Sequence, residues 1–167
     1  MSVRVLSNDS FNALSNSALS LHGTQHPESL TMTSDRTIGI VDTHASVSAS
    51  LSAALARAGY MPCAAYTFGD AIALMAIAEP AALIVSLELG AFNGLHVLLR
   101  SAVDYPSTRV VVVGPAQAAI EDEARALGAA AYVARPLDVD SVVDLVNSLL
   151  LGSDGAPAPV VPLVRHA

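Results

Sequence analysis

The 167-residue chain has a single cysteine, no tryptophan and few aromatic residues. Because Cys63 is alone, the chain can form no intrachain disulfide, and it can supply neither a thiolate zinc cluster nor a CxxC redox pair. We expect Cys63 to be a small buried hydrophobic residue in a strand. Aromatic residues make up only 4% of the chain, so the sequence lacks the side chains on which single-strand binders stack bases.

Positive charge is also scarce. The formal net charge is −7, and the eight Lys plus Arg residues are spread along the chain. Proteins that hold nucleic-acid phosphates need a basic face. The sequence therefore predicts no nucleic-acid binding by this chain alone.

The sequence contains no segment typical of a membrane span or of an export signal. No apolar run reaches the roughly 20 residues that cross a bilayer. The first six residues carry one cation and lead into no sustained apolar segment, which is not typical of a secretory signal. We expect a cytoplasmic protein with no membrane contact.

Hydrophobic residues make up 53% of the chain and charged residues 14%, which is ample for one core. The length fits one domain with tails. Residues 1–36 are rich in Ser, Asn and Thr and predict a polar, flexible leader, although a weak apolar spacing leaves open a short helix that docks on a partner. Residues 152–167 have the Pro, Ala and Gly content of a linker-like tail.

Between the tails, residues 37–151 alternate short apolar runs with helical periodicity, which is typical of βα units on a parallel sheet. Five strands are expected, at 37–42, 61–66, 82–86, 109–114 and 130–134. Five helices are expected, at 47–58, 70–78, 95–102, 117–127 and 139–150, with Gly59 and Gly128 ending two of them and Asp138 as the last N-cap. The sequence therefore predicts a doubly wound α/β domain.

In an open α/β sheet, ligands and chemistry collect at the carboxyl ends of the strands. Four expected strand ends carry candidate residues, namely Asp42-Thr43-His44, Ser86-Leu87-Glu88, Gly114-Pro115 and Arg135-Pro136. We expect these side chains to lie at one edge of the sheet.

Three segments of the sequence resemble the receiver domain of bacterial response regulators, namely Ile40 to Thr43, Leu83 to Leu95 and Gly128 to Leu137. The resemblance continues in register from Thr37 to Leu151, through all five units. It implies a flavodoxin-like fold with strand order 2-1-3-4-5 and a role in two-component, phosphorelay signal transduction.

Receivers hold two acids after the first strand, a phosphoacceptor Asp after the third, a Ser or Thr after the fourth and a Lys-Pro after the fifth. By position, these correspond here to Asp42 and Thr43, Ser86, Gly114, and Arg135 with Pro136. Only the first acid and the proline are kept. Ser86, at the phosphoacceptor position, has a hydroxyl with no evident base beside it. Thr43 stands where receivers have a second carboxylate ligand for Mg²⁺. Arg135 stands where they have a lysine, and its planar guanidinium is not equivalent to the compact charge of a lysine.

These departures predict a pseudo-receiver, which keeps the fold and binding surface of a receiver but not its aspartyl phosphorylation. Its degenerate phosphorylation pocket comprises Asp42, Thr43, Ser86, Glu88, Gly114, Arg135 and Pro136. We expect Arg135 to neutralise Asp42 directly, so that Mg²⁺ binds weakly or not at all. No catalytic residue, metal ligand or cofactor is predicted, and the chain is not expected to be an enzyme.

Several of these residues allow two interpretations. Glu88 can mimic a phosphoryl charge, although a solvated loop carboxylate is the preferred reading, and Ser86 can be a kinase target or an inert small residue. His44 is interpreted as a surface histidine. Tyr132 stands where receivers carry a switch aromatic and is predicted to be a fixed part of the binding face. The resemblance implies a cis peptide before Pro136.

The leading hypothesis is an adaptor that binds a protein partner, such as a kinase, regulator or output protein, through the fourth helix, fifth strand and fifth helix. A homodimer through the same face is a further expectation. The alternatives are a receiver phosphorylated on an unusual residue, the receiver of a truncated two-component transcription regulator, and a small-ligand carrier of the cobalamin-binding type. The last rests on Asp42-Thr-His44, but Val47 occupies the place of the glycine expected there.

Overall fold

The computed structural model describes residues 36–152, so the expected leader and nearly all of the expected tail lie outside the described residues. Five parallel strands form one sheet in the order β2-β1-β3-β6-β7. These strands are β1 (Thr37–Val41), β2 (Met61–Ala65), β3 (Ala82–Ser86), β6 (Arg109–Gly114) and β7 (Ala131–Ala134). Since β4 and β5 form a separate hairpin, this is the predicted 2-1-3-4-5 order, and the doubly wound fold is confirmed.

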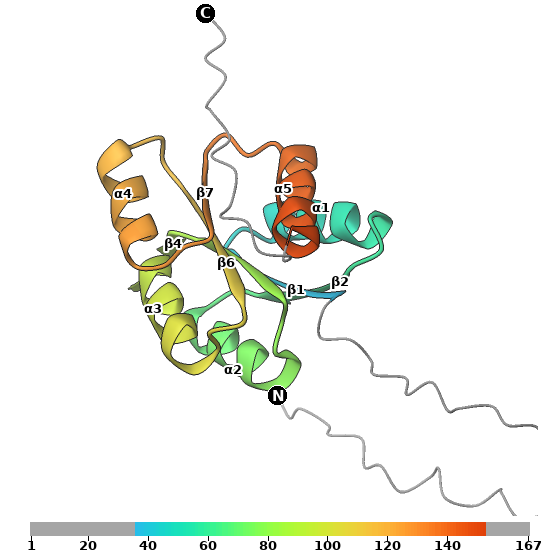
Figure 1. The fold of residues 1–167 in the computed structure, drawn as a ribbon, viewed down its shortest axis with the longest axis horizontal. Helices are drawn as coiled ribbons and strands as arrows, with labels where there is room; N and C mark the ends of the chain where they lie inside the picture. The colour runs from blue at the N-terminus through green and yellow to red at the C-terminus, as the bar shows by residue number, and fades with distance from the viewer. Residues whose placement is uncertain (1–35, 153–167) are drawn as a thin grey trace, which may run out of the picture. The chain divides into compact units, whose positions relative to one another are not determined.

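Helices cover both faces of the sheet (Figure 1). The helices are α1 (Ala45–Arg57), α2 (Phe68–Ala78), α3 (Gly94–Asp104), α4 (Ala118–Ala126) and α5 (Val139–Leu151). Alternate residues of a strand point to opposite faces. Ile38 and Ile40 of β1 therefore pack in the core under α1 and α5, whereas Val41 packs in the core under α2, α3 and α4.

The central strands are apolar on both faces, as expected for a parallel sheet covered by helices. All five residues of β3 are buried, and so are all residues of β6 except Arg109. Cys63 lies in the edge strand β2, as predicted, where it is a free cysteine and only partly buried. None of the helices within residues 36–152 is long and apolar enough to cross a membrane.

The stretch between β3 and α3, predicted as a loop through Gly90 to Gly94, contains a short antiparallel hairpin instead. Its strands are β4 (Glu88–Leu89) and β5 (Phe92–Asn93). Gly90 supplies the positive φ of +67° at its turn. A Cβ on Gly94 would lie 2.2 Å from the carbonyl oxygen of Ser86, so glycine allows α3 to begin directly against the end of β3.

Candidate functional site

The predicted residues meet at the carboxyl edge of the sheet. Asp42 directly follows β1, Ser86 ends β3, Gly114 ends β6 and Arg135 directly follows β7. Asp42 and Ser86 are both buried. Parallel pairing of β1 with β3 and of β6 with β7 brings these positions to the same edge of the sheet, where ligands of open α/β sheets bind.

Arg135 connects two of these strand ends. Its Nη2 donates a hydrogen bond to Asp42 Oδ2 at 2.8 Å and another to Ser86 Oγ at 3.2 Å. The Asp42 side chain is 5% exposed and the Arg135 side chain 34% exposed, so the ion pair is largely withdrawn from water. A buried carboxylate requires such a partner, because an unpaired charge in this position costs a large desolvation free energy.

The second carboxylate oxygen of Asp42 is bound by His44, the N-cap residue of α1. Asp42 Oδ1 accepts hydrogen bonds from the backbone N–H of His44 at 2.8 Å and from its Nδ1 at 2.9 Å. The His44 side chain is 59% exposed, in keeping with a surface histidine. The contact with Asp42 was not predicted, although an Asp-x-His spacing at a strand end is the signal that could have indicated it.

Tyr132 fills the space beside Gly114. A Cβ added to Gly114 would lie 2.3 Å from the Tyr132 hydroxyl oxygen and 3.1 Å from its Cζ. The hydroxyl donates a hydrogen bond to the backbone oxygen of Pro115 at 2.7 Å. Burial, and after it the negative charge of Glu121, raise the pKa of Tyr132. The tyrosine thus occupies the volume that a Ser or Thr side chain at position 114 would need.

A cleft of about 270 Å³ opens beside this cluster, lined among others by Ser86, Glu88, Gly114 and Arg135. Glu88 itself is exposed on β4 and contributes a carboxylate to the cleft wall. The cleft is the place where the predicted pocket and open solvent meet.

Three residues of the predicted pocket, Asp42, Thr43 and Pro136, do not line this cleft. Asp42 is buried beside it. Thr43 is exposed, and its Oγ1 lies 3.4 Å from Nδ1 of His44. Pro136 is exposed and follows a cis Arg135–Pro136 peptide bond, as the resemblance implied.

The residues at this edge do not fit a divalent cation. Magnesium requires several hard oxygen ligands, whereas both oxygens of Asp42 are already engaged by Arg135 and His44. Across residues 36–152, no three His, Cys, Asp or Glu side chains gather in a way that could hold a metal ion.

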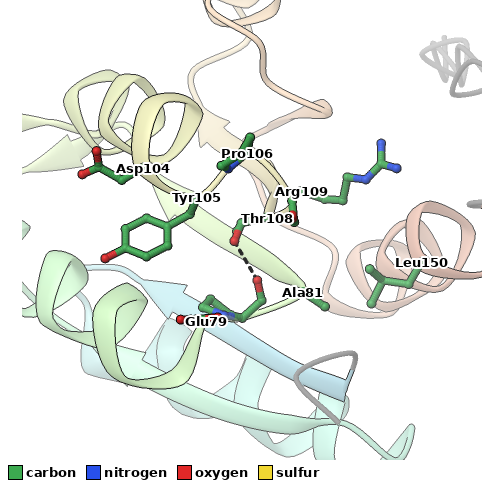
Figure 2. Close-up of a pocket in the computed structure, with 10 residues that line it drawn as sticks. Glu79, Ala81, Asp104, Tyr105, Pro106, Thr108, Arg109 and Leu150 are labelled. Carbon is green, nitrogen blue, oxygen red and sulfur yellow. Dashed lines mark hydrogen bonds between the residues drawn. The ribbon is translucent and has the colours of Figure 1, made fainter.

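A larger hollow of about 750 Å³ lies at the opposite edge, near the starts of β3 and β6 (Figure 2). Thr108 Oγ1 donates to the backbone oxygen of Pro80 there at 2.8 Å. Figure 2 shows the Arg109 guanidinium pointing away from Asp104, which is paired with Arg100. Since its polar groups do not converge, this hollow lacks the arrangement that a specific ligand site requires.

No family model and no curated protein matches this chain. Solved structures do match it. A CheY-like response regulator receiver domain protein from Methanospirillum hungatei is 20% identical, with a TM-score of 0.67 over 70% of this chain and 94% of that one. A response regulator from Thermotoga maritima is 19% identical, with a TM-score of 0.64 over 69% and 97%.

A response regulator from Burkholderia pseudomallei, solved with a phosphorylated aspartic acid, calcium ion and citrate, is 25% identical to this chain. Its TM-score is 0.63, over 76% of this chain and 77% of that one. The match covers nearly the whole length of the Methanospirillum hungatei and Thermotoga maritima proteins. The similarity therefore extends over the entire fold rather than over a single motif.

Proposed function

We propose that this chain, whose residues 36–152 have the fold of response-regulator receiver domains, is a pseudo-receiver that signals in the cytoplasm without aspartyl phosphorylation. One observation carries the proposal. At the end of β3, where receivers hold the phosphoacceptor, Ser86 is buried with its hydroxyl hydrogen-bonded to Arg135 at 3.2 Å.

Ser86 has no means of acting as a nucleophile in this arrangement. A serine hydroxyl is a weak nucleophile unless an adjacent base, a lowered pKa or a bound metal ion activates it. The side chain that contacts Ser86 Oγ is Arg135, and a guanidinium donates hydrogen bonds but accepts no proton. The proposal therefore assigns the chain a binding role and no enzymatic activity.

Arg135 also replaces the dication that a receiver pocket needs. The pocket holds one buried carboxylate, Asp42, which the guanidinium neutralises at 2.8 Å. With the charge balanced by the protein itself, the proposed function requires neither Mg²⁺ nor any other cofactor.

The proposed protein-binding surface is formed by α4, β7 and α5, as the resemblance implied, with Tyr132 as its fixed centre. These elements and the α5 N-cap carry six acids, with Arg125 as the one positive charge among them. The acids are Glu121, Asp122, Glu123, Asp138, Asp140 and Asp144. A partner with a basic surface fits this face, whereas two copies of it repel one another, so the homodimer expected here is not part of the proposal.

The test is an amide NMR spectrum of the full chain, recorded with and without Mg²⁺ and beryllofluoride, an analogue of the phosphoryl group. We expect no saturable shifts at His44, Ser86 or Arg135. The Burkholderia pseudomallei response regulator, which carries a phosphorylated aspartic acid in its solved structure, is the positive control and should shift under the same conditions.

A second readout is the mass of the chain after incubation with a small phosphodonor and Mg²⁺, which should be unchanged. Saturable shifts at the three amides, or a mass increase of one phosphoryl group, would contradict the proposal. The position of a phosphoryl group, if one formed, would then identify the unusual acceptor.

A further inference from the structure

Several exposed apolar side chains belong to neighbouring elements on one face of the sheet. Of the seven large hydrophobic residues exposed within residues 36–152, four belong to α2, β5 and α3. These four, Ile77, Phe92, Leu99 and Val103, are called the α2–α3 face below. Ile77 is 86% exposed and Val103 78% exposed. The two helices pack against each other and lie side by side in Figure 1.

Helix α2 is apolar on its outer as well as its inner side. Asp70 is its only polar side chain. Ala71 and Met75 are buried against the sheet, while Ile77 and its neighbour Ala76 point to solvent. A helix on the surface of a globular protein carries polar residues on its outer side, and one that is apolar all round is normally covered. None of the described residues covers it.

An ordered aromatic contact marks the other end of the face. The rings of Phe92 and Phe68 stack with centroids 4.8 Å apart, and His96 meets Phe92 edge-on at 6.4 Å. Phe92 is therefore exposed and at the same time packed against the ring of Phe68. Rigid aromatic side chains bind partners at little entropic cost, which is why they are common as interface anchors.

The charges on α3 are compatible with a second copy of the chain as the partner of this face. Arg100 and Asp104 are one turn apart and form an ion pair, Nε to Oδ2, at 2.5 Å. If two α3 helices pack antiparallel across a two-fold axis midway between these residues, each Arg100 lies opposite Asp104 of the other copy. The charges are therefore self-complementary, as an isologous interface requires. The surface of α4, β7 and α5, by contrast, carries six acids and a single arginine, so two copies of it repel one another.

We propose that two copies of this chain associate through the α2–α3 face, with their α3 helices antiparallel. Ile77, Phe92, Leu99 and Val103 supply the apolar contacts, and reciprocal Arg100–Asp104 pairs set the register. This leaves α4, β7 and α5 of each copy free for another protein. This association does not depend on whether the pocket at Ser86 binds a phosphoryl group.

The first experiment is sedimentation velocity of the full chain up to roughly 100 µM, at which an interface of even modest affinity populates a dimer. We expect a monomer–dimer equilibrium. Ile77→Glu and Val103→Glu should each weaken it at least about tenfold, since each buries a charge at the interface. Leu151→Glu is the matched control, because Leu151 is 81% exposed on α5, and it should leave the equilibrium unchanged.

The second experiment tests the two-fold register by charge reversal. Arg100→Asp alone and Asp104→Arg alone should each be monomeric, because each places like charges opposite one another in a homodimer. An equimolar mixture of the two variants should form a heterodimer, which a purely intrachain ion pair does not predict. Circular dichroism of each variant checks that its fold is retained.

A native chain that stays monomeric throughout the concentration range overturns the proposal. A dimer that Ile77→Glu and Val103→Glu leave intact also overturns it, because the copies then meet elsewhere. A dimer sensitive to both substitutions, whose charge variants do not pair on mixing, overturns the antiparallel register.

Discussion

Gly114 has no side chain, and this absence leaves the space that the Tyr132 ring occupies. The Tyr132 hydroxyl oxygen lies 2.3 Å from where a Cβ on residue 114 would be, and it donates a hydrogen bond to the backbone oxygen of Pro115 at 2.7 Å. A side chain at position 114 and the present place of Tyr132 are mutually exclusive.

Gly114→Ala should destabilise the domain by about 1–3 kcal/mol, because the new methyl group forces the ring out of a filled space. Urea unfolding measures this loss. Tyr132→Phe removes the atom nearest to the methyl group, so Gly114→Ala should cost less in that background. Equal costs in both backgrounds would mean that the two residues do not compete for the same volume.

At the scale of single elements, α5 shows how a local signal sets a helix boundary. Asp138 was predicted as its N-cap, and the Asp138 carboxylate accepts a hydrogen bond from the backbone N–H of Ser141 at 3.2 Å. It also accepts one from the Ser141 hydroxyl. Because both bonds favour the charged form, the hydroxyl first and the N–H second, the pKa of Asp138 lies below its usual range.

This cap should make part of the stability of α5 depend on pH. A depressed pKa means that the stabilisation is fully present above the ordinary pKa of an Asp and is lost as pH falls through the folded value. Asp138→Asn keeps a good N-cap that does not titrate. The free energy of unfolding of the native chain should therefore fall relative to that of the Asn variant between about pH 6 and about pH 2.

The comparison of the two chains by urea unfolding at several pH values isolates this residue, since every other acid is shared. A constant difference across the range would show that Asp138 titrates alike in the folded and unfolded chains.

The hairpin β4–β5 shows the limit of element prediction. Its strands have two residues each, too short for periodicity to reveal. What decides its place is the close approach of Gly94 to Ser86, which the sequence alone does not display.

At the scale of the whole molecule, Arg135 links the two ends of the domain. Its ion pair with Asp42 joins residues 93 positions apart in the chain, and its bond to Ser86 adds the middle strand of the sheet.

Arg135→Ala should cost about 1–3 kcal/mol, toward the lower end because the guanidinium is one-third exposed. The buried carboxylate of Asp42 would keep His44 as its partner but lose the cation. Arg125→Ala is the control, because Arg125 pairs with Glu121 on the surface of α4 at 2.6 Å. That change should stay within about 0.5 kcal/mol. Similar losses for both arginines in thermal or urea unfolding would contradict the structural role given to Arg135.

The sequence by itself determined the alternation of the five strands of the main sheet with five helices, and the edge at which Asp42, Ser86, Gly114 and Arg135 meet. These features follow from periodicity and from the geometry of parallel sheets, which are local or general properties.

Only the tertiary structure decided that His44 occupies the second oxygen of Asp42, that Tyr132 fills the space at Gly114, and that Ile77 and Val103 remain uncovered. Each of these depends on the positions of individual side chains brought together from distant segments. Periodicity records which residues tend to be buried, but it contains no information about which atoms then come into contact.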